Sequence, residues 1–121
     1  MGVTVSFLCQ NDKISISIVN DQGQWLYFYR GINSGVNTIH TSYRKAYTAA
    51  SLKVRTSVLS KMIEAPGFSQ LGKMEDDILL LTGGVPIFYK KTLVGAIGLS
   101  GSSNPIEEEQ CGIEAAQLLI K

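Results

Sequence analysis

The alternation of apolar and polar positions predicts a pair of strands near the start of the chain. In residues 13–19 isoleucines alternate with serines, and residues 24–30 alternate as well, which is the period of a β-strand. The segment Asn20–Gly23 between them is rich in turn-forming residues. We therefore predict an antiparallel hairpin, with the possibility of a further short strand over residues 3–9.

Helical periodicity appears in the middle and at the end of the chain. Apolar residues form one stripe over residues 39–50, at the spacing of an amphipathic helix. Thr56 is a candidate N-cap for a short helix over Ser57–Glu64. Asn104 is a candidate N-cap for the last helix, with Pro105 at its first position. The sequence thus predicts three helices.

Three further strands are predicted between the second and third helices. They are Ile78–Leu81, Val85–Tyr89 after the Gly83-Gly84 break, and Thr92–Leu99 after a turn at Lys90-Lys91. The order is two strands, two helices, three strands and one helix. We therefore predict an α+β fold with a five-stranded antiparallel sheet flanked by helices.

Composition limits the classes of function. A chain of 121 residues is one domain, residues 1–121. The net charge of +1 argues against a nucleic-acid partner, which requires a basic face. With 17% charged residues and 12 glycines, the weakly charged surface favours a homo-oligomer. No apolar run is long enough for a membrane helix and no signal peptide is visible, so we expect a cytoplasmic protein without a membrane partner.

The cysteines and the single histidine limit metal and redox chemistry. Cys9 and Cys111 lie far apart and form no C-x-x-C motif, so we expect no disulfide and a reducing cytoplasm. His40 is the only histidine, which excludes a multi-histidine metal site within one chain. Its position near the start of the first helix makes it the metal-ligand candidate, although a lone histidine is more often an ordinary surface residue.

Two glycine-containing loops are candidate phosphate or anion sites. Gly67–Lys73 has the spacing of a phosphate-binding loop, but Met74 replaces the required hydroxyl and the loop follows a helix instead of a strand. A surface loop is the better interpretation. Gly98–Asn104 leads into a helix N-terminus, where amides and hydroxyls form a plausible anion cradle. The alternative for this loop is a tight strand-to-helix connection.

Four stretches of the sequence together resemble a known family. Lys45–Ala50 is similar to its K-A-x-T-A-A helix, Gly83–Ile87 to its G-G-x-P segment, and Val94–Gly101 to its V-G-A-I-G-V-S-G signature. The turn at Val19–Gly23 fits as well, so that the likeness extends over residues 14–119. The chain resembles the GlcG/HbpS-like family, which includes the C-terminal domain of PduO-type proteins.

The resemblance implies a profilin-like fold and cytoplasmic or periplasmic oligomers. It also implies a place near glycolate, glycerol and propanediol catabolism, with haem bound by several members. In some members the haem-ligating histidine lies on a long helix before the first hairpin. Here the residues before the hairpin are few and patterned as a strand, so that helix is expected to be missing or replaced. Only His40 remains as an iron ligand.

These observations favour a small, non-enzymatic ligand-binding protein, with haem or a small anionic metabolite as its ligand. The expected pocket lies between the first helix, the bend at the start of the fourth predicted strand and the loop before the last helix. Its candidate residues are Lys45, Thr48, Gly84, Pro86, Gly98, Ser100, Gly101, Ser102, Ser103 and Glu107.

Two alternatives belong to other classes of function. An enzyme acting on small hydroxyacids or aldehydes would use Lys45 and Glu107 as acid–base groups, although no activated nucleophile can be named. A structural assembly module would use the aromatic strand, which places Trp25, Tyr27 and Tyr29 on one face.

Overall fold

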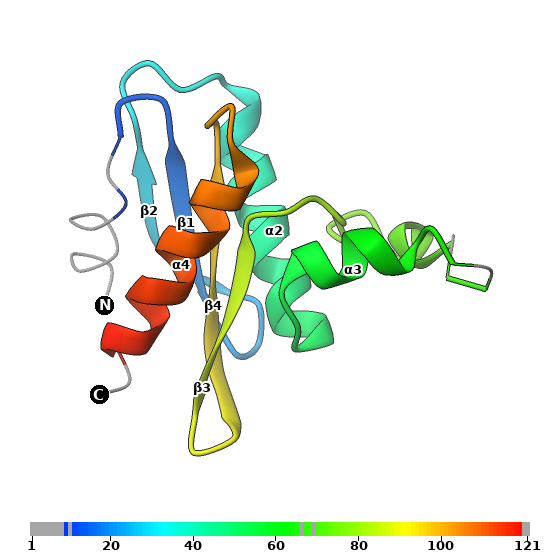
Figure 1. Ribbon diagram of the computed structural model, residues 1–121. Helices are drawn as coiled ribbons and strands as arrows, with labels where there is room; N and C mark the ends of the chain where they lie inside the picture. Colours follow the sequence, from blue (N-terminus) through cyan, green and yellow to red (C-terminus); the bar gives the residue numbers. More distant parts are fainter. Residues whose placement is uncertain (1–8, 10, 66, 69, 120–121) are drawn as a thin grey trace.

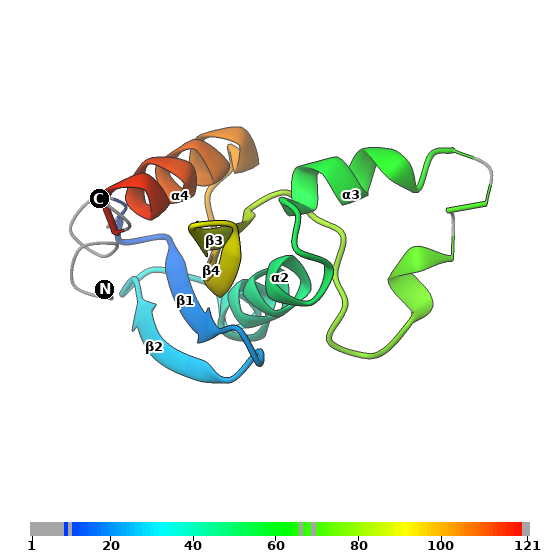
Figure 2. The ribbon, with the colours of Figure 1, turned by 90° about the horizontal axis from the view of Figure 1, so that it is seen from below.

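One antiparallel sheet between two helical layers forms the core of the protein (Figures 1 and 2). The computed structural model describes residues 9, 11–65, 67–68 and 70–119. Within them the sheet has the order β2-β1-β4-β3, and α2 and α4 cover its opposite faces (Figure 2). The α3 helix lies beside the edge strand β3, and η1 is a single 3-10 turn. The elements are β1 (Ser15–Asn20), β2 (Trp25–Arg30), α2 (Asn37–Leu52), α3 (Thr56–Met62), η1 (Leu71–Lys73), β3 (Gly84–Tyr89), β4 (Thr92–Ser100) and α4 (Pro105–Leu119).

The α+β class, the antiparallel sheet and both hairpins predicted from the sequence are confirmed. Lys90 and Lys91 form the β3–β4 turn, and both have positive φ. Asn104 caps α4, because its Oδ1 accepts a hydrogen bond from the backbone N–H of Glu107 at 3.3 Å. The profilin-like classification stays a prediction, and the strand expected over residues 3–9 lies, apart from Cys9, outside the described residues.

The serines of β1 face a helix rather than solvent. Ser15 and Ser17 are fully buried beneath α2, and each hydroxyl lies within hydrogen-bond distance of a hydroxyl on that helix. The Ser15 Oγ–Thr38 Oγ1 distance is 2.8 Å and the Ser17 Oγ–Ser42 Oγ distance is 2.7 Å. A buried polar face is tolerated because its groups are paired in this way.

The five-stranded sheet and the strand at Ile78–Leu81 are wrong for the part of the chain that the structure describes: its sheet has four strands. The segment is extended, but its backbone bonds to a side chain instead of a neighbouring strand. The N–H of Leu79 donates to Thr48 Oγ1 at 2.8 Å. Ile78 and Leu80 are buried with Leu59 in a small cluster beyond the sheet edge. The apolar run therefore indicates that this segment is buried. A short apolar run does not show whether the buried segment is also a strand paired in a sheet.

Thr56 is not the N-cap of α3, as the sequence had suggested. The cap position is Arg55, and Thr56 is the first residue of the helix, with a fully buried side chain. Its hydroxyl accepts a hydrogen bond from the N–H of Gly84 at 2.9 Å. The threonine therefore ties α3 to the start of β3.

A register shift changes the predicted faces of β2. The pairing of β1 and β2 shifts between Ile18 and Val19, so that Trp25 lies opposite Val19. Trp25 packs against Tyr43 of α2 and against Phe28, with ring centroids 4.6 and 5.7 Å away. Trp25 therefore shares a face with Phe28 and not with Tyr27 and Tyr29, because a bulge reverses the alternation along a strand.

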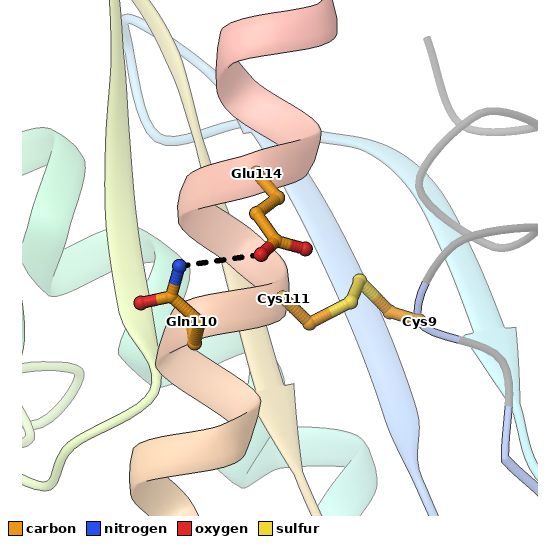
Figure 3. The surroundings of a disulfide bond; sticks show 4 residues. All are labelled: Cys9, Gln110, Cys111 and Glu114. Carbon is orange, nitrogen blue, oxygen red and sulfur yellow. Dashed lines mark hydrogen bonds between the residues drawn. A yellow bond between two sulfur atoms is a disulfide. The ribbon is translucent and has the colours of Figure 1, made fainter.

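A disulfide joins Cys9 to Cys111, so the expectation of free cysteines is wrong (Figure 3). The two Cα atoms are 5.8 Å apart, across a sequence separation of 102 residues. Cys9 is buried in the core cluster against which Cys111 of α4 packs. The sequence spacing gave no sign of this pairing, because the fold brings Cys9 next to α4 across most of the length of the chain. Because the two cysteines are paired, they no longer support a location in a reducing compartment.

Reduction of this disulfide should lower the stability of the fold. Cross-linking a loop of this length restricts the unfolded chain, and the expected loss of unfolding free energy is about 4 kcal/mol. Urea unfolding with and without dithiothreitol measures it. A Cys9→Ser/Cys111→Ser variant is the control, since dithiothreitol should not change its midpoint. Equal midpoints for the oxidised and reduced wild type would contradict the prediction.

Candidate functional site

The α2 helix approaches the sheet closely where two strands carry glycine. A Cβ atom at Gly98 of β4 would meet the backbone oxygen of Ser42, and one at Gly84 of β3 would meet that of Lys45. Both glycines are buried. Larger residues would push the helix away, so the glycines set the height at which α2 lies. This contact determines how far the side chains of α2 reach across the end of the sheet.

Among the described residues, Lys45 is the only buried cation, with 4% of its surface exposed. Its Nζ donates a hydrogen bond to the backbone oxygen of Leu99 at 2.8 Å and lies 3.8 Å from Oε1 of Glu108. Gly83, at φ +130°, leaves room for it, since a Cβ there would lie 2.8 Å from Nζ. Burial lowers the pKa of the Lys45 ammonium, and the charge of Glu108 partly opposes that shift.

Glu108, not the predicted Glu107, is the carboxylate that faces Lys45. Its Oε2 accepts a hydrogen bond from the N–H of Ser102 at 3.2 Å, and only 3% of the residue is exposed. Burial raises its pKa, while Lys45 and the Ser102 N–H oppose the shift. The sequence contained a signal for it, because position 108 lies on the same helical stripe as Cys111 and Ala115.

A polar cleft of about 400 Å³ lies beside this ion pair. Lys45, Ser100, Gly101 and Ser102, all predicted site residues, line it together with Glu108. Glu108 itself contacts Lys45 and the N–H of Ser102, so it takes the place that an anionic ligand would have at the predicted anion cradle. What the cleft offers to a ligand is therefore mainly hydroxyl groups, from Thr41, Ser60, Thr82, Ser100 and Ser102.

A second hollow, an apolar groove of about 470 Å³, lies between α3 and α4 over β3. Val58, Val85, Phe88 and Ile113 are among its walls, together with the predicted site residue Pro86. Both hollows lie along α4: Pro105 and Glu108 line the cleft, and Ile113, Ala116 and Gln117 line the groove.

The remaining predicted residues lie outside both hollows. Thr48 is buried and fastens Leu79 to α2. Ser103 and Glu107 are exposed, Glu107 beside a smaller hollow of about 180 Å³ near the disulfide. His40 is exposed on α2. Among the described residues, no three His, Cys, Asp or Glu side chains lie close enough together to hold a metal ion.

The Lys45–Glu108 pair gives a pH-dependent prediction. Lys45→Met leaves a buried carboxylate without its cation, which should cost about 3–5 kcal/mol at neutral pH. Because the folded-state pKa of Glu108 is raised above its ordinary 4.5, its stabilising contribution is fully present below that pH and lost as the pH rises. The penalty should therefore be smallest in acid and grow toward neutral pH, as measured by urea unfolding at several pH values.

The control is the double variant Lys45→Met/Glu108→Gln, which removes both charges. It should lose much less stability than the sum of the two single variants, and its penalty should not grow toward neutral pH, because it has no buried carboxylate to ionise at this position. If Lys45→Met lowered the unfolding free energy by the same amount in acid and at neutral pH, ionisation of Glu108 without its cation would cost nothing. That result would contradict the prediction.

Comparison with known proteins gives consistent matches over nearly the whole chain. The family model described as "Haem degrading protein HbpS-like" matches residues 7–117. A relative from Citrobacter freundii, an uncharacterized 15.0 kDa protein in the dhaT-dhaS intergenic region, is 28% identical over 109 residues, 88% of this chain and 75% of that protein. No described helix combines the length and apolar character that crossing a bilayer requires.

Solved structures agree with this match. The crystal structure of a double mutant of HbpS from Streptomyces reticuli has a TM-score of 0.86 at 28% identity, covering 98% of this chain and 80% of that one. A complex of PduOC with haem has a TM-score of 0.80 at 22% identity, covering 93% and 86%, which shows a shared fold. Because the family model spans most of its residues, this chain belongs to the HbpS-like family.

Proposed function

We propose that this protein is a non-enzymatic small-molecule-binding protein whose ligand is haem or a similar flat molecule that carries carboxylates. The observation that carries the proposal is the pair of hollows along α4, one lined mostly by polar residues and one lined mostly by apolar residues. Concave sites that combine apolar walls with a few polar groups are typical binding sites for small molecules. The family's description as haem degrading and the PduOC–haem complex support haem.

The internal contacts of Lys45 favour binding over catalysis. Its ammonium group bonds to Leu99 and faces Glu108, so the candidate acid–base group already has two partners within the fold. A link to glycolate, glycerol or propanediol catabolism, and a location in the cytoplasm, remain part of the proposal. The catabolic link is supported by the family resemblance and by the relative encoded between dhaT and dhaS. The Cys9–Cys111 disulfide is typical of an oxidising compartment and counts against the cytoplasm.

Titration with hemin tests the proposal. The purified protein should shift the Soret absorption band of hemin, and the shift should saturate at one hemin per chain, because we propose a single binding site on each chain. Heat-denatured protein at the same concentration is the control for unspecific adsorption. A Soret band that is unchanged, or that shifts equally with the denatured sample, would rule out haem as the ligand.

We also propose a homo-oligomer that forms through β2. This strand lies at the edge of the sheet in the described residues, and it exposes large apolar side chains. Trp25 is 42% exposed, Leu26 58% and Phe28 37%. An exposed apolar edge strand readily pairs with another chain. The proposal is compatible with ligand binding, since none of the three residues lines the cleft or the groove.

Light scattering after size-exclusion chromatography tests this interface. Leu26→Lys should convert the oligomer to a smaller species without unfolding it, because a charge on an edge strand opposes pairing. Met74→Lys is the matched control, since Met74 is 60% exposed against 58% for Leu26. Met74 directly follows η1, whose Leu71 packs with residues of α3 beyond β3, the edge of the sheet opposite β2. A wild type that is already a monomer, or equal dissociation in both variants, would contradict the interface.

A further inference from the structure

Of the predicted site residues, only Pro86 lines the apolar groove. We propose that this groove binds the ring of a tetrapyrrole, and that the binding does not require the iron. The inference rests on the proposed function in taking a tetrapyrrole as the ligand. It adds the place where the ring lies and the chemistry that the protein recognises.

The walls of the groove suit a flat apolar ring. Val58 comes from α3, Val85 and Phe88 from β3, and Ile113 and Ala116 from α4. These side chains cover the ring without requiring hydrogen bonds from it, and the aromatic ring of Phe88 can contact another π-system. The volume of about 470 Å³ is within the range of pockets that enclose small molecules and cofactors. Among the described residues that line the cleft, only Leu81 and Pro105 have apolar side chains.

The charges at the groove suit the propionates of a tetrapyrrole. Among the described residues that line it, Lys53 and Arg55 are cations and none is a carboxylate. Lys53 ends α2 and Arg55 precedes α3, so the short link between the helices places both at the groove. Arg55 Nη1 lies 3.3 Å from Oε1 of Glu109, a pair made through one nitrogen and one oxygen. Two cations near one carboxylate leave a net positive charge for an anionic ligand.

The composition of the groove argues for recognition of the ring and not of the metal. Among the described residues that line it, none is His, Cys, Met or Tyr, the usual protein ligands of haem iron. His40 lines neither hollow, and α2, which carries it, lies on the opposite face of the sheet from α4 (Figure 2). The energy of binding therefore comes from apolar contact and propionate pairing, which an iron-free porphyrin provides equally.

Parallel titrations with hemin and protoporphyrin IX test the inference in the full chain. Both should bind wild-type protein, with dissociation constants that differ less than about threefold. Val58→Trp should weaken both by at least about tenfold, because the larger side chain fills the groove. Val94→Trp is the matched control: Val94 is 37% exposed against 39% for Val58, and it does not line the groove.

A charge reversal tests the propionate contact separately. Arg55→Glu should weaken both ligands by about tenfold, whereas Arg55→Lys should keep most of the affinity. Lys61→Glu is the control, since Lys61 is an exposed cation of α3 that does not line the groove. Circular dichroism of each variant verifies that the fold is retained. Equal weakening by Lys61→Glu would show a general effect of net charge and overturn the specific contact.

The outcomes separate this inference from the proposed function. Binding of hemin without binding of protoporphyrin IX, together with loss of hemin binding in His40→Ala, would overturn the groove and keep a haem-binding function. Equal weakening by Val58→Trp and Val94→Trp would also overturn the groove. Failure of both ligands to bind would overturn the inference and the haem form of the proposed function together.

Discussion

The structure depends on the close contact between α2 and the sheet, which Gly84 and Gly98 allow. Because neither residue has a side chain, the backbone of the helix lies directly over β3 and β4. The alanines of α2 fill the remaining space, and the hydroxyls of β1 pair with those of the helix. A Cβ at Gly98 would displace the helix, and every contact that α2 makes across the end of the sheet would change with it.

The buried pair of Lys45 and Glu108 follows from this contact. At the height that the glycines set, Lys45 reaches past the end of the sheet to Leu99 and to Glu108 on α4, and so joins the two helical layers. Removing two charges from water is costly, and the opposite pKa shifts of the two groups report that cost. Loss of either partner would leave a buried charge unpaired, so the pair ties α4 to α2 at the end of the sheet. Glu108 thereby uses the Lys45 ammonium and the N–H of Ser102 as its own partners.

The disulfide and the groove lie on two different faces of α4. Cys111 links this helix to Cys9 at the start of the described chain (Figure 3). Ile113 and Ala116 line the groove together with residues of α3 and β3. A helix that is held covalently on one side provides a fixed wall on the other. Ligand binding along α4 then requires little ordering of the backbone, which is the usual benefit of a preformed pocket.

The sequence by itself determined the family, the two hairpins, the three helices and the capping of α4, because periodicity, turn residues and capping are local properties of the chain. It also indicated Lys45 and Ser102. Only the tertiary structure decided that Ile78–Leu81 is not a strand, that Cys9 and Cys111 form a disulfide, and that Glu108 and not Glu107 meets Lys45. These outcomes depend on which distant segments become neighbours, and adjacent residues such as Glu107 and Glu108 differ only in the direction that the packed helix gives them.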